Sequence, residues 1–194
     1  MAKYEKVFSD YEILKTSIKF EDMDQAVRIG CVGQATEELA VRVVTKNCEG
    51  IQVKSVATGA TSGTLSLTLH MRHDLYVRAF GMDLDGLKSG VYAYGKNSRH
   101  EEFCLVAEIH DEDGNKKLIA YPRCVMASAP NSSPVNGAEE VAEIEIELNL
   151  FADDDGNVKY VAILEELEED LTDAWFSNFN AELVKTSGEN SEEV

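Results

Sequence analysis

Alternation of apolar and polar residues predicts that much of this chain is β-structure. The clearest case runs over residues 143 to 150, where the two residue types interleave at every second position. Successive side chains of a strand point to opposite faces. We therefore expect a strand with one apolar face and one face that carries three carboxylates. The apolar set is Ile144, Ile146, Leu148 and Leu150, and the polar set is Glu143, Glu145, Glu147 and Asn149.

Other segments add strands and one helix to this picture. Residues 64 to 71 alternate equally cleanly, and shorter strand patterns occupy residues 27 to 32, 39 to 45, 91 to 94, 103 to 110, 116 to 126 and 158 to 164. Over residues 73 to 82 the apolar spacing changes to three and four, which predicts one short helix that packs on the sheet. The Asp-rich sequences at 111 to 115 and 153 to 157 predict hairpin turns, because Asp favours a turn start and Gly supplies a positive φ. The pattern is that of an antiparallel β-meander.

The chain divides into three parts on this pattern. Residues 1 to 24 are weakly patterned and predict an N-terminal arm, residues 25 to 166 predict one β domain, and residues 167 to 194 form an acidic C-terminal extension that we expect to be disordered after about residue 187. Residues 46 to 63 are rich in small and polar residues and predict a long loop. Loops of that length are usually functional or disordered, and its apolar residues, Ile51, Val53 and Val56, predict docking on another surface.

Charge is distributed unevenly along the chain. The net charge is −18, and residues 139 to 194 contribute −16 of it, because 18 acidic residues there face only Lys159 and Lys185. DNA is gripped through lysine and arginine that neutralise phosphates. The chain is therefore a poor candidate for binding nucleic acid, although its acidic part could repel it. A simpler alternative for the acidic strand is a solvated edge strand that keeps the protein soluble.

Catalytic and metal-binding motifs are not evident. The Asp-rich turns lack the spacing of a calcium loop, His70 and His73 have no third ligand placed beside them, and nucleotide-cradle and nucleophile-elbow signatures are missing. We expect no enzyme activity, no cofactor and no metal, with a β-sandwich hydrolase that uses the clustered acids as an open alternative. The cysteines, which are Cys31, Cys48, Cys104 and Cys124, are expected to be reduced and mostly buried. No apolar run is long enough for a membrane helix, which predicts a soluble cytoplasmic product.

The order of these elements resembles that of the major tail tube protein of long-tailed, siphovirus-type bacteriophages. The resemblance covers roughly residues 20 to 166. It rests on four parts of this sequence: the succession of strand, long loop, strand and short helix that ends in LYVRAFGMD at 75 to 83; VYAY at 91 to 94; the strand pair joined at 111 to 115 and followed by LIAYPRC at 118 to 124; and the acidic alternating strand. These are similarities of pattern and order.

The resemblance implies an antiparallel β-sandwich or barrel with one short flanking helix, assembled into hexameric rings that stack into a tube. It implies that Glu143, Glu145, Glu147 and Asn149 line the channel, and that the loop with Ile51, Val53 and Val56 contacts an adjacent ring. The aromatic residues of the C-terminal extension, which are Trp175, Phe176 and Phe179, are either interface residues or pack on their own domain.

The same resemblance implies the partners and the location. The partners are further copies of this chain, tape-measure and tail terminator or initiator proteins, and double-stranded DNA that passes without binding. The expected location is the tail of a virion, after assembly in the host cytoplasm, with no membrane contact. The alternative within this class is the tube of a contractile injection system or a phage-derived bacteriocin.

Overall fold

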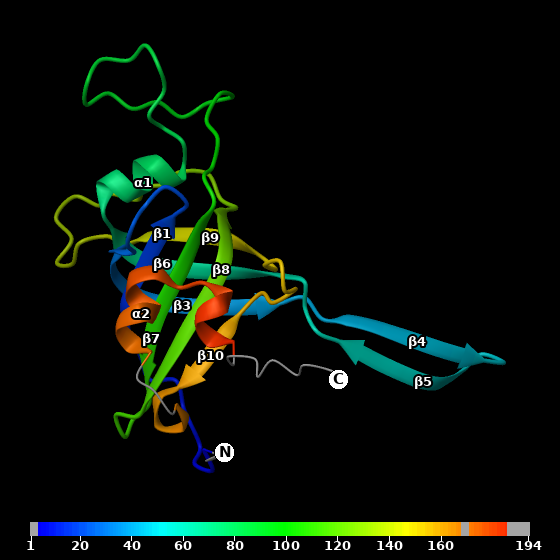
Figure 1. Ribbon diagram of the computed structural model, residues 1–194. Coiled ribbons are helices and arrows are strands. Elements are labelled where there is room, and N and C mark those ends of the chain that lie inside the picture. Colours follow the sequence, from blue (N-terminus) through cyan, green and yellow to red (C-terminus); the bar gives the residue numbers. More distant parts are fainter. Residues whose placement is uncertain (1–3, 168–170, 186–194) are drawn as a thin grey trace, which may run out of the picture.

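Antiparallel strands make up most of the protein in the computed structural model, which describes residues 4 to 167 and 171 to 185 (Figure 1). The strands are β1 (Glu12–Phe20), β2 (Val27–Arg28), β3 (Gly30–Leu39), β4 (Arg42–Cys48), β5 (Ile51–Thr58), β6 (Ser62–Met71), β7 (Phe103–His110), β8 (Lys116–Met126), β9 (Ile144–Phe151) and β10 (Tyr160–Ile163). The helices are α1 (His73–Ala79) and α2 (Thr172–Asn178), with 3-10 turns η1 (Leu164–Glu166) and η2 (Ala181–Val184).

Eight of the strands form one folded sheet, in the order β2-β1-β7-β8-β9-β6-β3, with β10 also paired to β8. Strands β1, β7 and β8 form one layer, and β9, β6 and β3 cross them as the second layer (Figure 1). The two ends of the sheet approach each other, since Ile29 alone connects β2 to β3 and its amide donates to the carbonyl of Thr16 in β1 over 3.1 Å. The expected mainly β fold with a flanking helix is therefore confirmed.

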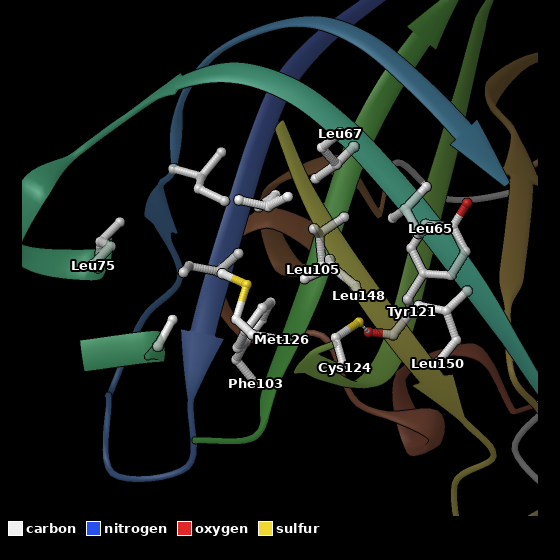
Figure 2. Close-up of a cluster of buried hydrophobic side chains, with 14 of the residues drawn as sticks. Leu65, Leu67, Leu75, Phe103, Leu105, Tyr121, Cys124, Met126, Leu148 and Leu150 are labelled. Carbon is white, nitrogen blue, oxygen red and sulfur yellow. Dashed lines mark hydrogen bonds between the residues drawn. The ribbon is translucent and has the colours of Figure 1, made fainter. Parts of the chain in front are cut away.

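The core lies between these two layers (Figure 2). Alternate residues of β6 and β9 point into it, and Phe20 packs edge-on against Phe103 with ring centroids 5.5 Å apart. Burying each large apolar side chain stabilises the fold by ~1.5 to 3 kcal/mol, so this set dominates stability. Fully buried members are Leu65, Leu67, Leu69, Leu105, Ile146, Leu148 and Leu150.

Helix α1 closes one end of the core with Leu75 and Phe80. Its last turn is a Schellman motif, in which the amide of Gly81 bonds the carbonyl of Arg78 and the amide of Met82 bonds that of Val77. Gly81 takes a φ of 60° to make this turn. The helix therefore stops earlier than its apolar spacing to residue 82 predicts.

The two Asp-rich turns share local chemistry but connect strands differently. In each, the first Asp accepts two backbone amides: Asp111 from Asp113 and Asn115, and Asp153 from Asp155 and Asn157. The turn at 111 to 115 joins the paired strands β7 and β8, as predicted.

The predicted hairpin at residues 153 to 157 was wrong. Strands β9 and β10, on either side of this turn, do not pair with each other; both run antiparallel to β8, one after the other along the same edge. The turn therefore connects two strands that pair with successive parts of the same edge of β8. Turn chemistry alone does not determine which strands pair.

The N-terminal part of the chain belongs to the sheet, contrary to the prediction. The weak pattern of residues 1 to 24 predicts an arm, but Glu12–Phe20 is a sheet strand paired with β7, and Ile18 and Phe20 are fully buried. A bulge after Leu14, where Lys15 has a φ of 51°, interrupts its alternation and hides the strand pattern.

The predicted strand at residues 27 to 32 is divided in two. Strand β2 pairs with β1, whereas β3 pairs with β6, so the chain crosses between layers at Ile29 and Gly30. Gly30 has a φ of 147°, and a Cβ at this position would lie 1.8 Å from the carbonyl oxygen of His70. Gly33 marks a bulge in β3, as its sequence suggests.

The secondary structure of two further segments differs from the prediction: one predicted loop is a β-hairpin, and one predicted strand is irregular. Residues 46 to 63 are not a loop, because β4 and β5 pair as a hairpin that leaves the body of the protein (Figure 1). Its two-residue turn, Glu49 and Gly50, has positive φ at both positions, which is type I′ geometry. Residues 91 to 94 are not a strand; Tyr92 packs against His73 instead, and Tyr94 packs against Phe80.

The cysteines are free thiols, but they are less buried than expected. Cys31 and Cys48 are exposed, Cys104 is half-buried and Cys124 is buried. Cys48 lies next to the hairpin turn, where no core is available to cover it. The prediction of mostly buried thiols was therefore wrong for these two positions.

Candidate functional site

Strand β9 has the two faces that its sequence predicts. Ile146, Leu148 and Leu150 are buried, while Glu145, Glu147 and Asn149 between them are exposed. Glu143 lies just before the strand and is exposed too. The alternation is produced by burial of one face in the core, which leaves the carboxylates on the outside of this layer.

The neighbouring strands extend this outer face with polar side chains. On β6, Thr68 lies opposite Glu145, Ser66 opposite Glu147, and Thr64 opposite Asn149. On β3, the next strand, Gln34, Thr36 and Glu38 lie opposite those three β6 residues. We call these nine outward residues of β9, β6 and β3 the acidic face.

The acidic face contains three carboxylates and no basic residue. Within the described residues, none of the three has an ion-pair partner. On the opposite side of β3, by contrast, the inward Glu37 is bonded by the hydroxyl of Tyr121 and by Lys159 at 2.6 Å. The protein pairs a carboxylate where it is enclosed and leaves the outer ones to solvent.

The hairpin β4–β5 is the second unusual surface. All of its residues are exposed, including Ile51, Val53 and Val56, which are 69%, 55% and 43% exposed. Its strands pair only with each other in the described part of the chain. An isolated two-stranded hairpin is marginally stable in water, and the apolar side chains of this one are not covered in the monomer.

Strand β3 provides a third feature, since within residues 4 to 167 and 171 to 185 it ends the sheet and pairs with β6 alone. The strand is ten residues long and contains neither Lys nor Pro, the residues that commonly block edge pairing. Its outer edge is not paired with another strand in the described residues.

The C-terminal aromatic residues pack on their own domain. Trp175 is 1% exposed and Phe179 is 6% exposed, both against Val106, Leu118 and Ala120 on the outer side of β7 and β8. The indole Nε1 of Trp175 donates to the carbonyl of Ile119 over 3.2 Å. Phe176 is half-buried in the same cluster. Of the two alternatives for these residues, the structure contains the packing one.

The buried carboxylate of Glu108 is the centre of a polar cluster that the sequence does not indicate. It is 1% exposed and contacts Lys15 Nζ at 2.8 Å and His110 Nε2 at 2.6 Å. Burial raises its pKa, but these hydrogen bonds outweigh burial and leave the pKa of Glu108 below its usual value. From alternation alone Glu108 belongs to a solvent face, and the lysine that contacts it, Lys15, lies 93 residues earlier in the chain.

The described residues do not assemble a metal site. No three His, Cys, Asp or Glu side chains there converge in a way that could hold a metal ion. The Asp-rich turns bond their own backbone amides, and His70 is exposed on β6. In the same part of the chain, none of the helices has the length and apolarity needed to cross a membrane.

Comparisons with known proteins give limited information. No protein family and no curated protein matches the sequence. Among solved structures, the chain is similar to one of the tube terminating cap of the anti-feeding prophage, with a TM-score of 0.47, 10% identity, and 82% of this chain and 96% of that chain covered. It is also similar to a chain of the anti-feeding prophage baseplate, with a TM-score of 0.42, 11% identity, and 86% and 100% covered. Likeness of this degree does not define a function.

Proposed function

We propose that this protein is a structural subunit of a phage-type tail, which assembles with copies of itself into stacked hexameric rings. The observation that carries the proposal is the combination of an unpaired acidic face with a hairpin that is exposed on all sides. In a monomer the apolar side chains of the hairpin remain exposed. An assembly can use the hairpin as a contact and turn the acidic face toward an enclosed channel.

The free edge of β3 supports lateral assembly. Strand addition from a neighbouring copy would bond its unpaired amides and carbonyls and would remove the aggregation hazard of an open edge. Repeating the same contact around a ring closes it, as heterologous contacts do when their rotation allows closure. The hairpin, with Ile51, Val53 and Val56, would then join one ring to the next.

The acidic face would serve a channel by repulsion. Carboxylates of Glu145 and Glu147 on this face, together with Glu143 just before β9, repel DNA phosphates over about a Debye length, ~8 Å at physiological salt, so that DNA slides past a water layer. Asn149 continues the same surface without charge. No bond is made or broken in this role, and it needs no cofactor or metal.

The partners and the location of the protein follow from the same proposal. In a tail, the end rings contact terminator and initiator proteins, and a tape-measure protein occupies the channel before DNA does. A contractile injection tube or bacteriocin is the alternative of the same class, and the two are distinguished by whether a sheath protein co-assembles around the rods.

Negative-stain electron microscopy of the concentrated protein tests the proposal. We expect rings or rods of uniform width with a central channel. A protein that remains monomeric at every concentration and salt, in analytical ultracentrifugation as well, would sink the proposal.

The channel role has its own test, replacement of Glu143, Glu145 and Glu147 together by Gln in assembled particles. We expect tubes to form and DNA to leave more slowly, with the defect easing at high salt because screening weakens the repulsion that is being removed. A matched control replaces exposed acids outside the acidic face, Glu112 and Asp113. Equal ejection rates for both variants and the wild type would remove the acidic face from the channel.

A further inference from the structure

Two lysines face each other across the hairpin. Lys46 on β4 lies directly opposite Lys54 on β5, a like-charge pair that destabilises a hairpin standing alone. Arg42 lies on the same hairpin face, and Val44 and Val56 form an exposed apolar pair between the charges. We call these residues the basic hairpin face. In the described residues, none of its three bases has an ion-pair partner, although most bases of the main body do.

The segment before β9 has the opposite character. Residues 135 to 143, which we call the acidic loop, carry Glu139, Glu140 and Glu143, all exposed and without an ion-pair partner among the described residues. Val135 and Val141 in the same loop are 69% and 82% exposed. The basic hairpin face and the acidic loop thus each combine exposed valines with unpaired charged residues, and the charges of the two surfaces have opposite signs.

Within one copy these two surfaces cannot meet. The hairpin leaves the body next to Ser62, at one end of β6, whereas the acidic loop enters β9 at Ile144, which pairs with Leu69 near the other end. Seven residues of strand separate Ser62 from Leu69, which is ~24 Å at about 3.4 Å per residue. Moreover, the hairpin points away from the body, on the side opposite the start of β9 (Figure 1). A contact between them must therefore join two copies.

We propose that the basic hairpin face docks on the acidic loop of a second copy, with Lys46 and Lys54 against Glu139 and Glu140. The proposal rests on the proposed stacking function and names both surfaces of that contact. Because the two surfaces differ and lie at opposite ends of the sheet, the contact is heterologous and can be repeated without limit, as a growing stack requires. Packing of the valines would supply apolar burial, while the charges would set register and direction.

Charge reversal tests the pairing. The variants are K46E/K54E, E139K/E140K and the combined quadruple variant, with K88E/K96E as the control, because Lys88 and Lys96 are exposed lysines outside the hairpin. Circular dichroism of each variant checks folding, and rod length is measured by negative-stain microscopy and sedimentation velocity. All positions changed are exposed, so the core is left intact.

We expect rods from the wild type and the control, unstacked rings from each double reversal, and rods again from the quadruple variant, in which the charges are exchanged. Rods from either double reversal, or folded quadruple protein that stays unstacked, would overturn the pairing while leaving self-assembly in place. Recovery of K46E/K54E by E145K/E147K would also overturn it, by moving the contact to the acidic face. A wild type that forms no assembly would instead count against the proposed function itself.

Discussion

Replacing Trp175 by alanine tests whether the C-terminal helix belongs to the folding unit of the subunit. The indole is 1% exposed, and its Nε1 donates to the carbonyl of Ile119. A Trp side chain buries ~150 to 250 Å², which is ~4 to 6 kcal/mol at ~25 cal/mol per Å². Measured Trp-to-Ala losses in cores are ~3 to 5 kcal/mol. We expect a loss in this last range, a large part of a typical stability of ~5 to 15 kcal/mol.

Urea unfolding followed by far-ultraviolet circular dichroism measures this loss. Two controls accompany this measurement. Trp175→Phe keeps most of the apolar area but loses the hydrogen bond, and it should lower the free energy of unfolding by ~1 to 2 kcal/mol. Tyr11→Ala removes an aromatic ring that is 77% exposed and should lower it by less than ~0.5 kcal/mol. A W175A protein with the wild-type midpoint would refute the packing argument. If that variant also failed to form rods, Trp175 would be an interface anchor instead.

Three further changes probe the fold and its charges. Leu148→Ala in β9, where the side chain is fully buried, should lower the free energy of unfolding by ~2 to 5 kcal/mol in the same urea assay, and a smaller loss than an exposed control would contradict the core assignment. Gly81→Ala should destabilise by ~1 kcal/mol or more, because φ is 60° and the new Cβ would lie 2.1 Å from the carbonyl oxygen of Arg99; unchanged thermal melting would argue against it. Since the folded pKa of Glu108 is depressed, its pairing with Lys15 stabilises the protein above the unfolded glutamate pKa and is lost as pH falls through the folded one. Stability measured from pH 7 downward should therefore decline less steeply for Glu108→Gln, and parallel profiles would disprove this linkage.

Strand identity was predictable where one face of the strand meets the core and no bulge interrupts the alternation, as one does in β1. Residues 64 to 71 and 144 to 150 alternate because Leu67 and Ile146 are buried while their neighbours face outward. The hairpin lacks this signal, because both of its faces are exposed and no burial selects a period. Its turn is also disguised, since Glu49 stands where Asn, Asp or Gly usually indicates a type I′ turn.

Long-range arrangement was harder to predict than local structure. The polar face of β9 was identified from its sequence, but its partners on β6 and β3 depend on strand order, which no local pattern encodes. Likewise, Glu108 meets Lys15 only because β1 pairs with β7, and Trp175 is buried only because α2 packs against β7 and β8. Chemistry on a single strand can be predicted, whereas chemistry shared between distant strands requires the fold.

The four thiols differ in exposure, so a maleimide dye can label some of the cysteines and not others. Burial raises the pKa of Cys104 to about 12, so almost none of it is in the nucleophilic thiolate form near neutral pH, and Cys124 is enclosed. With Cys31 replaced by serine, a fluorophore would attach at Cys48 alone, beside the hairpin turn. The emission of that single label would then follow the hairpin tip as it leaves water, in real time and without altering any side chain of the core.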